Sequence, residues 1–446
     1  MHWLLEKIQS FKERKAIIYQ DYIYTYSDLF TRATHFLEHI CVDLKNGEVA
    51  AILSDYSFAS IALFLALVEN RNIIVPITTK PTNEVEERLL EAQVDHIVTI
   101  DDEECTITSS NNNGDKHGLI RQLQDGGNSG LILFSSGSTG KPKAMIHNLD
   151  KLLDTYCHKK QKSLAFLVFL MFDHIGGLNT LFNALSMGVT IVIPSKREPE
   201  YVCDLIEKYK INILPASPTF LNLILISDAY KDRDLSSLIM VTYGTEQMPE
   251  SLLVRLKEAF PRVRFLQTFG TSETGIAQAT SKSSSSTYMK IDDPNLEYKI
   301  VDGELWLKSK TQALGYLNAP MGRFSEDGWF KTGDLVETEE DNYIRIIGRN
   351  SEIINVGGQK VLPAEVESVL LQMPEIADCM VYGSENLITG QIVEADVVLV
   401  DEMPPQEIKK RVLIFCRDKL ERFKTPAKIN VVGRTNFNDR FKKVRK

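Results

Sequence analysis

Apolar residues along the first part of the chain follow two alternating patterns. Continuous apolar runs such as Val49–Leu53 and Ile73–Val75 are typical of buried strands. Between them, Tyr26–Ile40 and Ser57–Glu69 carry apolar residues at helical spacing. The same alternation returns over residues 149–268. Strands that alternate with helices predict βαβ units, in which helices cover mainly parallel sheets.

Three later features depart from this alternation. The polar segment Asp101–Gly130 contains several turn-forming residues and predicts an exposed connection. From Ser281 onward, short alternating strands separated by turns, such as Glu297–Val301, predict a small antiparallel barrel or sheet. From Asn350 a separate unit begins, and its patterns predict two further helices, Pro363–Gln372 and Pro405–Lys419.

These patterns predict an α/β protein of two domains. The large N-terminal domain, residues 1–349, is expected to hold two helix-covered, mainly parallel sheets and a small β-barrel. The small C-terminal domain, residues 350–446, is expected to be an α+β unit. With 446 residues and a hydrophobic content of 43%, the chain is long enough to bury a core in each domain.

Charge and composition exclude several classes of protein. The 51 basic and 60 acidic residues give a net charge of −9, which argues against nucleic acid as a partner. The 6 cysteines are scattered without metal-ligand spacing, as in reduced cytosolic proteins. The first residues lack a signal-peptide pattern, and the longest apolar run, Leu164–Phe172, is too short to span a bilayer. We therefore expect a soluble cytoplasmic protein without a membrane span.

The most informative segment follows the apolar run Leu131–Phe134. Gly137 and Gly140 allow the backbone to bend and bring amide N–H groups close to an anion. Hydroxyl and ammonium groups surround them, from Ser135, Ser136, Ser138, Thr139, Lys141 and Lys143. Only two residues separate Gly137 from Gly140, and Pro142 follows Lys141, so the loop is not the common P-loop of NTPases. The segment predicts a site for the phosphates of a nucleotide triphosphate.

Several further motifs occur in order along nearly the whole chain. Together with the phosphate loop they resemble the AMP-forming adenylating superfamily of acyl- and aryl-CoA synthetases, luciferases and peptide-synthetase adenylation domains. The chain is most similar to a short stand-alone acyl- or aryl-CoA ligase. The motifs are Tyr243-Gly244-Thr245-Glu246, Phe269-Gly270-Thr271-Ser272-Glu273, Thr332-Gly333-Asp334, Gly348-Arg349, Val356-Gly357-Gly358 and Lys442-Lys443-Val444.

The resemblance implies an acid–thiol ligase that uses ATP and Mg²⁺. A carboxylate attacks the α-phosphate of ATP, which gives an acyl-adenylate and pyrophosphate, and CoA then takes the acyl group as a thioester. Attacker and triphosphate are both anionic, so the site must neutralise charge and align the atoms. Two alternatives stay open: transfer to the phosphopantetheine of a separate carrier protein, and a non-catalytic regulator that only binds nucleotide.

The resemblance also implies roles for single residues. Lys443, Ser272 and Glu273 are the expected catalytic residues, with Glu273 as the ligand of Mg²⁺. Asp334 would accept both ribose hydroxyls, Arg349 would support the ribose or the phosphate, and Phe269 would lie near adenine. The remaining expected nucleotide contacts are Ser135, Ser136, Gly137, Ser138, Thr139, Gly140, Lys141, Lys143, Tyr243, Gly244, Thr245, Glu246, Gly270 and Thr271.

The acid pocket allows two alignments. In the first, His174 is the gate residue of CoA ligases, and the pocket wall is Ile175, Gly176 and Gly177. In the second, Asp173 pairs with the ammonium of an amino acid; the neighbouring glycines favour the first alignment. A histidine that only caps the following helix is a third possibility. The expected acid is therefore fatty or aromatic.

The family further implies a mobile C-terminal domain. After adenylation it would rotate about a hinge at Ser351, withdraw Lys443 and bring Gly357 and Gly358 to a tunnel for the thiol. Lys442 stands where the family usually has glycine.

Overall fold

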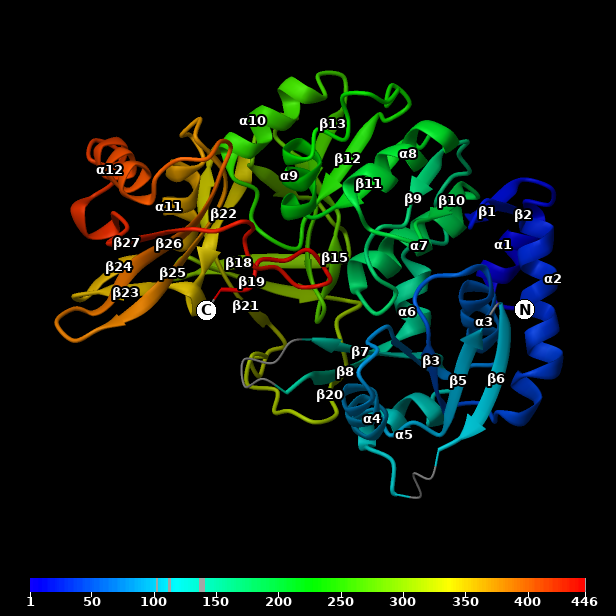
Figure 1. Ribbon diagram of the computed structural model, residues 1–446. Coiled ribbons are helices and arrows are strands. Elements are labelled where there is room, and N and C mark those ends of the chain that lie inside the picture. The colour runs from blue at the N-terminus through cyan, green and yellow to red at the C-terminus, as the bar shows by residue number, and fades with distance from the viewer. Residues whose placement is uncertain (102, 111–113, 136–140, 446) are drawn as a thin grey trace.

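The computed structural model describes residues 1–101, 103–110, 114–135 and 141–445 (Figure 1). In the described part of the chain, no helix is both long and apolar enough to cross a membrane.

The first of two seven-stranded sheets is parallel except at one edge (Figure 1). Its antiparallel edge pair lies near the N-terminus, where β1 is followed directly by β2. In spatial order the strands are β13 (Arg264–Gln267), β12 (Met240–Tyr243), β11 (Ile213–Ala216), β9 (Ala165–Leu167), β10 (Thr190–Ile193), β1 (Lys15–Tyr19) and β2 (Tyr22–Thr25). The helices between these strands are α7 (Ile175–Met187), α8 (Pro199–Tyr209), α9 (Pro218–Ile226) and α10 (Glu250–Ala259).

The second seven-stranded sheet is parallel in its centre and antiparallel towards both edges. In spatial order its strands are β20 (Gly315–Tyr316), β8 (Lys143–Asn148), β7 (Gly130–Ser135), β4 (Ile73–Ile77), β3 (Val49–Leu53), β5 (His96–Asp101) and β6 (Glu104–Ser109). The remaining helices of this region are α1 (Trp3–Ser10), α2 (Tyr26–His39), α3 (Phe58–Glu69), α4 (Thr82–Glu91), α5 (Gly118–Asp125) and α6 (Leu149–Asp154), with a 3₁₀ turn η1 (Cys41–Asp43). Side chains of α3 and α7 share one core, so the two sheets pack together through their helices.

The prediction that residues 101–130 form only an exposed connection is wrong. The segment contains β6 and the amphipathic helix α5. Ile120 and Leu123 of α5 are buried against the sheet. Polar residues on the other face of this short helix obscured its apolar stripe.

A third, antiparallel sheet follows, as the alternating pattern after Ser281 predicts. In spatial order its strands are β16 (Ala279–Ser281), β17 (Met289–Ile291), β22 (Tyr343–Arg349), β21 (Phe330–Glu339), β19 (Glu304–Ser309) and β18 (Leu296–Val301). A two-stranded ribbon of β14 (Phe269–Thr271) and β15 (Gly275–Ala277) precedes it, and η2 (Glu340–Asn342) joins β21 to β22.

The C-terminal unit has its own sheet and core. Its elements are β23 (Ile354–Val356), β24 (Gln359–Val361), α11 (Pro363–Leu370), β25 (Ile376–Asn386), β26 (Gly390–Leu399), α12 (Pro405–Cys416), η4 (Arg422–Lys424) and β27 (Lys428–Val431). The short turn η3 (Asn350–Glu352) connects it to β22. The change of sheet between Arg349 and Ile354 is compatible with the predicted boundary, which stays a prediction, as does the mobility of this domain.

After β27 the chain crosses from the small domain towards the large one, drawn in red in Figure 1. Residues 435–445 fold back on themselves, and we call them the terminal hairpin. A bridge pairs Phe437 with Lys443, and the Asn438 amide donates to the Lys442 carbonyl at 3.0 Å.

Candidate active site

A cleft of about 2090 Å³ lies where the large domain faces the small domain and the terminal hairpin. Its walls include the carboxyl ends of β11 and β12, the loop after β14, the edge of the antiparallel sheet and the hairpin tip. Ligands of open α/β sheets bind at this end of the strands. A pocket for one small ligand usually measures about 300–1,000 Å³, so this cleft has room for two substrates.

The segment after β12 enters the cleft with its backbone. A Cβ atom on Gly244 would lie 2.6 Å from Thr268 Oγ1, so this position requires glycine. Gly244 and Thr245 line the cleft, and Gly270 and Thr271 line it from β14. Tyr243, in contrast, is the last residue of β12, is 1% exposed and lies in the core.

Phe269, like Tyr243, does not reach the cleft, where it was expected to lie near adenine. Its side chain packs against the core of the antiparallel sheet. Among the described residues that line the cleft, neither Phe269 nor Tyr243 appears. The structure therefore does not bring the predicted adenine-stacking residue to the site.

Ser272 and Glu273 both line the cleft. Glu273 is 7% exposed, and its Oε1 accepts a hydrogen bond of 2.8 Å from the Tyr316 hydroxyl. Burial, followed by the charge of Glu273, raises the pKa of Tyr316, so this hydroxyl stays a donor. Lys143 Nζ lies 5.7 Å from the centre of the Tyr316 ring. Tyr316 thus fixes one carboxylate oxygen and links it to the end of the phosphate loop.

Asp334 and Arg349 form an ion pair on neighbouring strands. The two residues face each other directly across β21 and β22, and Arg349 Nε donates to Asp334 Oδ1 at 2.8 Å. The charge of Asp334 raises the pKa of Arg349 above its ordinary value. Arg349 lines the cleft, whereas Asp334 is 3% exposed and lies behind it. The structure thus brings together the two residues predicted for the ribose.

His174 lies on the other side of the cleft as the N-cap of α7. Its Nδ1 accepts a hydrogen bond of 3.0 Å from the Gly176 amide, as the capping alternative predicts. Burial, and secondly the positive charge of Arg440, lower the pKa of His174 to about 4. The ring is therefore neutral near pH 7, and with Nδ1 as acceptor its proton is on Nε2. His174 can cap the helix and still offer an N–H donor.

Only part of the predicted pocket wall faces the cleft. Ile175 and Gly176 line it, but Gly177 does not appear among the described lining residues. A Cβ atom on Gly177 would lie 2.3 Å from the carbonyl oxygen of Met171. Gly177 is therefore glycine because α7 passes close to the preceding loop, which corrects its predicted contact with the acid.

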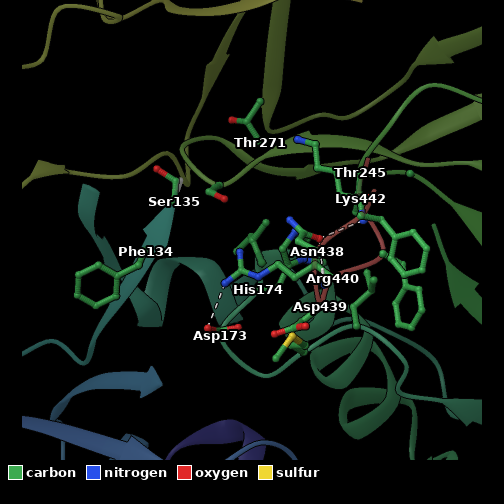
Figure 2. Close-up of a pocket in the computed structure, with 18 of the residues that line it drawn as sticks. Phe134, Ser135, Asp173, His174, Thr245, Thr271, Asn438, Asp439, Arg440 and Lys442 are labelled. Carbon is green, nitrogen blue, oxygen red and sulfur yellow. Dashed lines mark hydrogen bonds and ion pairs between the residues drawn. The ribbon is translucent and has the colours of Figure 1, made fainter. Parts of the chain in front are cut away.

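The carboxylate of Asp173 is not free, because it forms ion pairs with two arginines. Arg88 Nη1 lies 3.4 Å and Arg440 Nη2 lies 3.1 Å from its Oδ2, and Asp173 is 3% exposed. Figure 2 shows Arg440 reaching Asp173 beside His174. Two positive charges already balance this single carboxylate. The arrangement disfavours the alternative in which Asp173 pairs with the ammonium of an amino acid.

The terminal lysines point to opposite sides. Lys443 Nζ donates to Asp378 Oδ1 at 3.0 Å and to the Cys379 carbonyl at 2.5 Å, inside the small domain. Burial would lower the pKa of Lys443, but the charges of Asp378 and Glu367 outweigh it and raise this pKa. This corrects the expectation that the Lys443 side chain points into the site.

Lys442 lines the cleft instead, beside Thr245 and Thr271 (Figure 2). No carboxylate of the described residues lies within 4.0 Å of its ammonium group. Burial, and secondly the charge of Arg349, lower the pKa of Lys442. The cleft therefore holds a poorly solvated cation without an ion-pair partner, which suits an incoming phosphate.

The remaining predicted residues divide into those that line the cleft, those that lie away from it and those that lie outside the described part of the chain. Ser135 and Lys143 line the cleft and Lys141 is exposed, while Ser136, Gly137, Ser138, Thr139 and Gly140 lie outside the described residues. Glu246 lies behind the cleft wall and accepts hydrogen bonds from the amides of Thr219 and Lys443. Ser351, in the predicted hinge, lines the cleft.

Gly357 and Gly358 form the exposed turn between β23 and β24. Their φ angles of 58° and 87° favour glycine. A Cβ atom on Gly358 would meet nothing within 4 Å. In this arrangement of the domains, no crowding among the described residues therefore supports the predicted role of the two glycines at a thiol tunnel.

Comparison with known protein families agrees with this geometry. The model of the AMP-binding enzyme family matches residues 4–317, and the model of the AMP-binding enzyme C-terminal domain matches residues 365–438. The chain belongs to the AMP-binding enzyme family. The resemblance stated from the motifs is thus confirmed.

Relatives of this family match the chain over almost its whole length. The 2-succinylbenzoate–CoA ligase of Bacillus subtilis is 26% identical, over 98% of this chain and 95% of its own. Among solved structures, the anthranilate CoA ligase AuaEII in complex with anthranoyl-AMP has a TM-score of 0.81 at 20% identity, over 98% of this chain and 94% of its own. The o-succinylbenzoate coenzyme A synthetase of Bacillus subtilis, in complex with ATP and magnesium ion, has a TM-score of 0.74 at 23% identity, over 98% and 96%.

These matches confirm the predicted fold class of the AMP-binding enzyme. All three relatives are named as CoA ligases or synthetases, in agreement with the predicted class of acid–thiol ligase.

Four residues that line the cleft of this AMP-binding enzyme were not identified as site residues from the sequence: Arg88, Tyr316, Arg440 and Lys442. The pattern Lys-Val-x-Lys at residues 443–446 selects Lys443 over Lys442 from the sequence, whereas the structure brings Lys442 to the cleft. Tyr316 lies in a short Gly-Tyr strand without a charged neighbour, and no sequence pattern linked it to Glu273.

Proposed function

We propose that this protein activates an aromatic carboxylic acid with ATP to an acyl-adenylate and then transfers the acyl group to CoA. One observation carries the proposal: a single cleft collects an unpaired cation, a nearly buried carboxylate and a neutral histidine. These groups are Lys442, Glu273 and His174. They suit a reaction in which two anions must approach each other.

In the first step the carboxylate oxygen forms a bond to the α-phosphorus while the bond to the pyrophosphate oxygen breaks. Lys442 would neutralise charge between the carboxylate and the α-phosphate. His174 would donate its Nε2 proton in a hydrogen bond to the acid. Arg349, held by Asp334, would bind the nucleotide from the antiparallel sheet. In the second step the sulfur of CoA attacks the acyl carbon, and AMP leaves.

The donor set fits Mg²⁺. Only one oxygen of the Glu273 carboxylate has a side-chain hydrogen bond among the described residues, so the other can bind a metal ion. No group of three His, Cys, Asp or Glu side chains in this part of the chain could form a complete metal site. Mg²⁺ commonly binds through one or two carboxylates together with substrate phosphates and waters. When bound, the ion would neutralise charge on the phosphates.

The named relatives favour an aromatic acid with a second negative charge. The relatives named above include ligases for 2-succinylbenzoate and anthranilate, both aromatic acids, and 2-succinylbenzoate has two carboxylates.

Acid-dependent release of pyrophosphate tests the proposed function. We expect 2-succinylbenzoate to give the highest kcat/KM in a panel with anthranilate, benzoate, 4-coumarate and a C8 fatty acid, and CoA to convert the product to a thioester. A fatty acid as the best substrate would contradict the aromatic assignment. No release with any acid, from protein that binds Mg-ATP, would favour the non-catalytic alternative.

The hydrogen bond from Tyr316 to Glu273 gives a second test. Tyr316→Phe keeps the ring but removes the donor that orients the carboxylate, so the Mg²⁺ concentration for half-maximal activity should rise about 10-fold or more. A Mg²⁺ titration of pyrophosphate release measures this. Tyr26→Phe is the matched control, because it removes a buried hydroxyl that bonds the Val189 carbonyl far from the cleft. An unchanged Mg²⁺ requirement in Tyr316→Phe would contradict the predicted role.

A further inference from the structure

The tip of the terminal hairpin is anchored on the large domain by an aromatic side chain. The ring centre of Phe441 lies 5.4 Å from that of Phe169 and 5.0 Å from that of Phe220. Phe169 is 1% and Phe220 is 0% exposed, so both belong to the core of the large domain. Phe441 therefore inserts from the C-terminal segment against a preformed aromatic surface.

A charged contact lies next to the aromatic one. Arg440 pairs with Asp173, which is 3% exposed and is held from its other side by Arg88 of α4. The second oxygen of Asp173, Oδ1, is buried and has no hydrogen-bond partner among the described residues. Since a buried carboxylate is costly without compensation, the arrival of Arg440 contributes to its neutralisation.

The backbone of the tip is fixed as well. Asn438 Oδ1 accepts the amides of Arg440 at 3.0 Å and Lys442 at 3.1 Å, and Phe441 adopts a positive φ of 52°. On the other side of Lys442, the amide of Lys443 donates to Glu246 of the large domain at 3.2 Å. The lysine in the cleft is thus flanked on both sides by residues that contact the large domain.

We propose that Asp173, Phe169 and Phe220 form a receptor on the large domain for the terminal hairpin, and that docking of Arg440 and Phe441 there positions Lys442 for acyl-adenylate formation. Arg440 and Phe441 act through Lys442, so they are positioning residues. The inference rests on the proposed function. It adds that the wall of the acid pocket also serves as a docking site for the small domain.

Measuring the two half-reactions separately distinguishes a role in positioning Lys442 from a general loss of stability. Phe441→Ala and Arg440→Gln should each slow acid-dependent pyrophosphate release by about 10–100-fold, because a small misplacement of a reacting group has effects of this size. The same variants should form thioester from chemically prepared acyl-adenylate and CoA at the rate of the unchanged protein. Arg422→Gln is the matched control, since the side chain of this exposed arginine in the small domain makes no hydrogen bond or ion pair with any described residue. Equal losses in both half-reactions, or no loss in either, would overturn the proposal.

Limited trypsin digestion tests docking without any turnover. Lys442 and Lys443 are protected while the hairpin is docked, so cleavage after them should be faster in Phe441→Ala and Arg440→Gln than in Arg422→Gln. This result is expected even if the protein activates no acid, which distinguishes failure of the docking from failure of the proposed function. If Arg440 instead binds the acid, Arg440→Gln would raise the KM for the acid and leave the digestion rate unchanged. That outcome would overturn the proposal.

Discussion

Replacing Lys442 by alanine will slow acid-dependent pyrophosphate release by about 10²–10³-fold, the loss typical when one preorganised donor to a developing charge is removed. The ammonium of Lys442 faces the cleft without a carboxylate within ion-pair distance in the described part of the chain. Its charge is therefore available to the α-phosphate and the attacking carboxylate. The unfolding midpoint should stay unchanged, because the substitution breaks no ion pair of the structure.

Lys443→Ala should mainly lower the stability of the protein and have less effect on its activity. It removes the partner of Asp378, a carboxylate with 8% of its side chain exposed, and breaking such a buried pair costs about 3–5 kcal/mol. The variant should therefore unfold at lower denaturant concentration, with a smaller loss of adenylation than Lys442→Ala. Comparing steady-state rates with unfolding curves for both variants separates the two roles. Full activity in Lys442→Ala, with loss of activity but normal stability in Lys443→Ala, would restore the assignment made from the sequence.

Glu273→Gln should lower pyrophosphate release by about 10²–10³-fold, since charge neutralisation by a bound metal ion is worth several kcal/mol in the transition state. Glutamine keeps an oxygen that can accept the Tyr316 hydroxyl, so the loop should keep its shape. The substitution removes only the negative charge that would hold Mg²⁺. The activity lost should be recovered in part at high Mg²⁺ concentration.

Glu87→Gln is the control for this substitution. Glu87 also lines the cleft, but on the helix α4, and it has no ion pair among the described residues. Its kcat and Mg²⁺ requirement should match those of the unchanged protein. If Glu273→Gln also kept both quantities unchanged, Glu273 would not be the ligand of the metal.

Much of the fold follows from local patterns. The apolar runs predicted as strands, Val49–Leu53 and Ile73–Val75, lie in adjacent parallel strands, because continuous apolar runs must be buried on both faces. The helix α5 was missed because its two buried residues, Ile120 and Leu123, lie within a polar segment of turn-forming residues. A short helix gives too few periodic positions to stand out from such surroundings.

The sequence predicts the site best where a motif fixes the backbone. It predicts less where a distant contact sets the direction of a side chain. Gly244, Gly270 and Ser272 line the cleft, since they lie at or next to strand ends. The direction of Lys443 is set by Asp378, 65 positions away in the sequence. Alternation along the hairpin makes the two lysines face opposite ways, but which of them faces the cleft depends on this distant contact. The contact between Tyr316 and Glu273 is likewise not visible in any local pattern.

Lys442 and Lys443 point in opposite directions because side chains alternate between the two faces of an extended segment. Successive side chains of an extended segment project to opposite faces, so one residue of the pair must face the small domain when the other faces the cleft. Deleting one residue of the hairpin before Lys442 would shift this alternation and exchange the two ammonium groups. The identity of the lysine offered to a nucleotide is therefore encoded in the length of the hairpin, and a change in length would exchange the two without replacing either lysine.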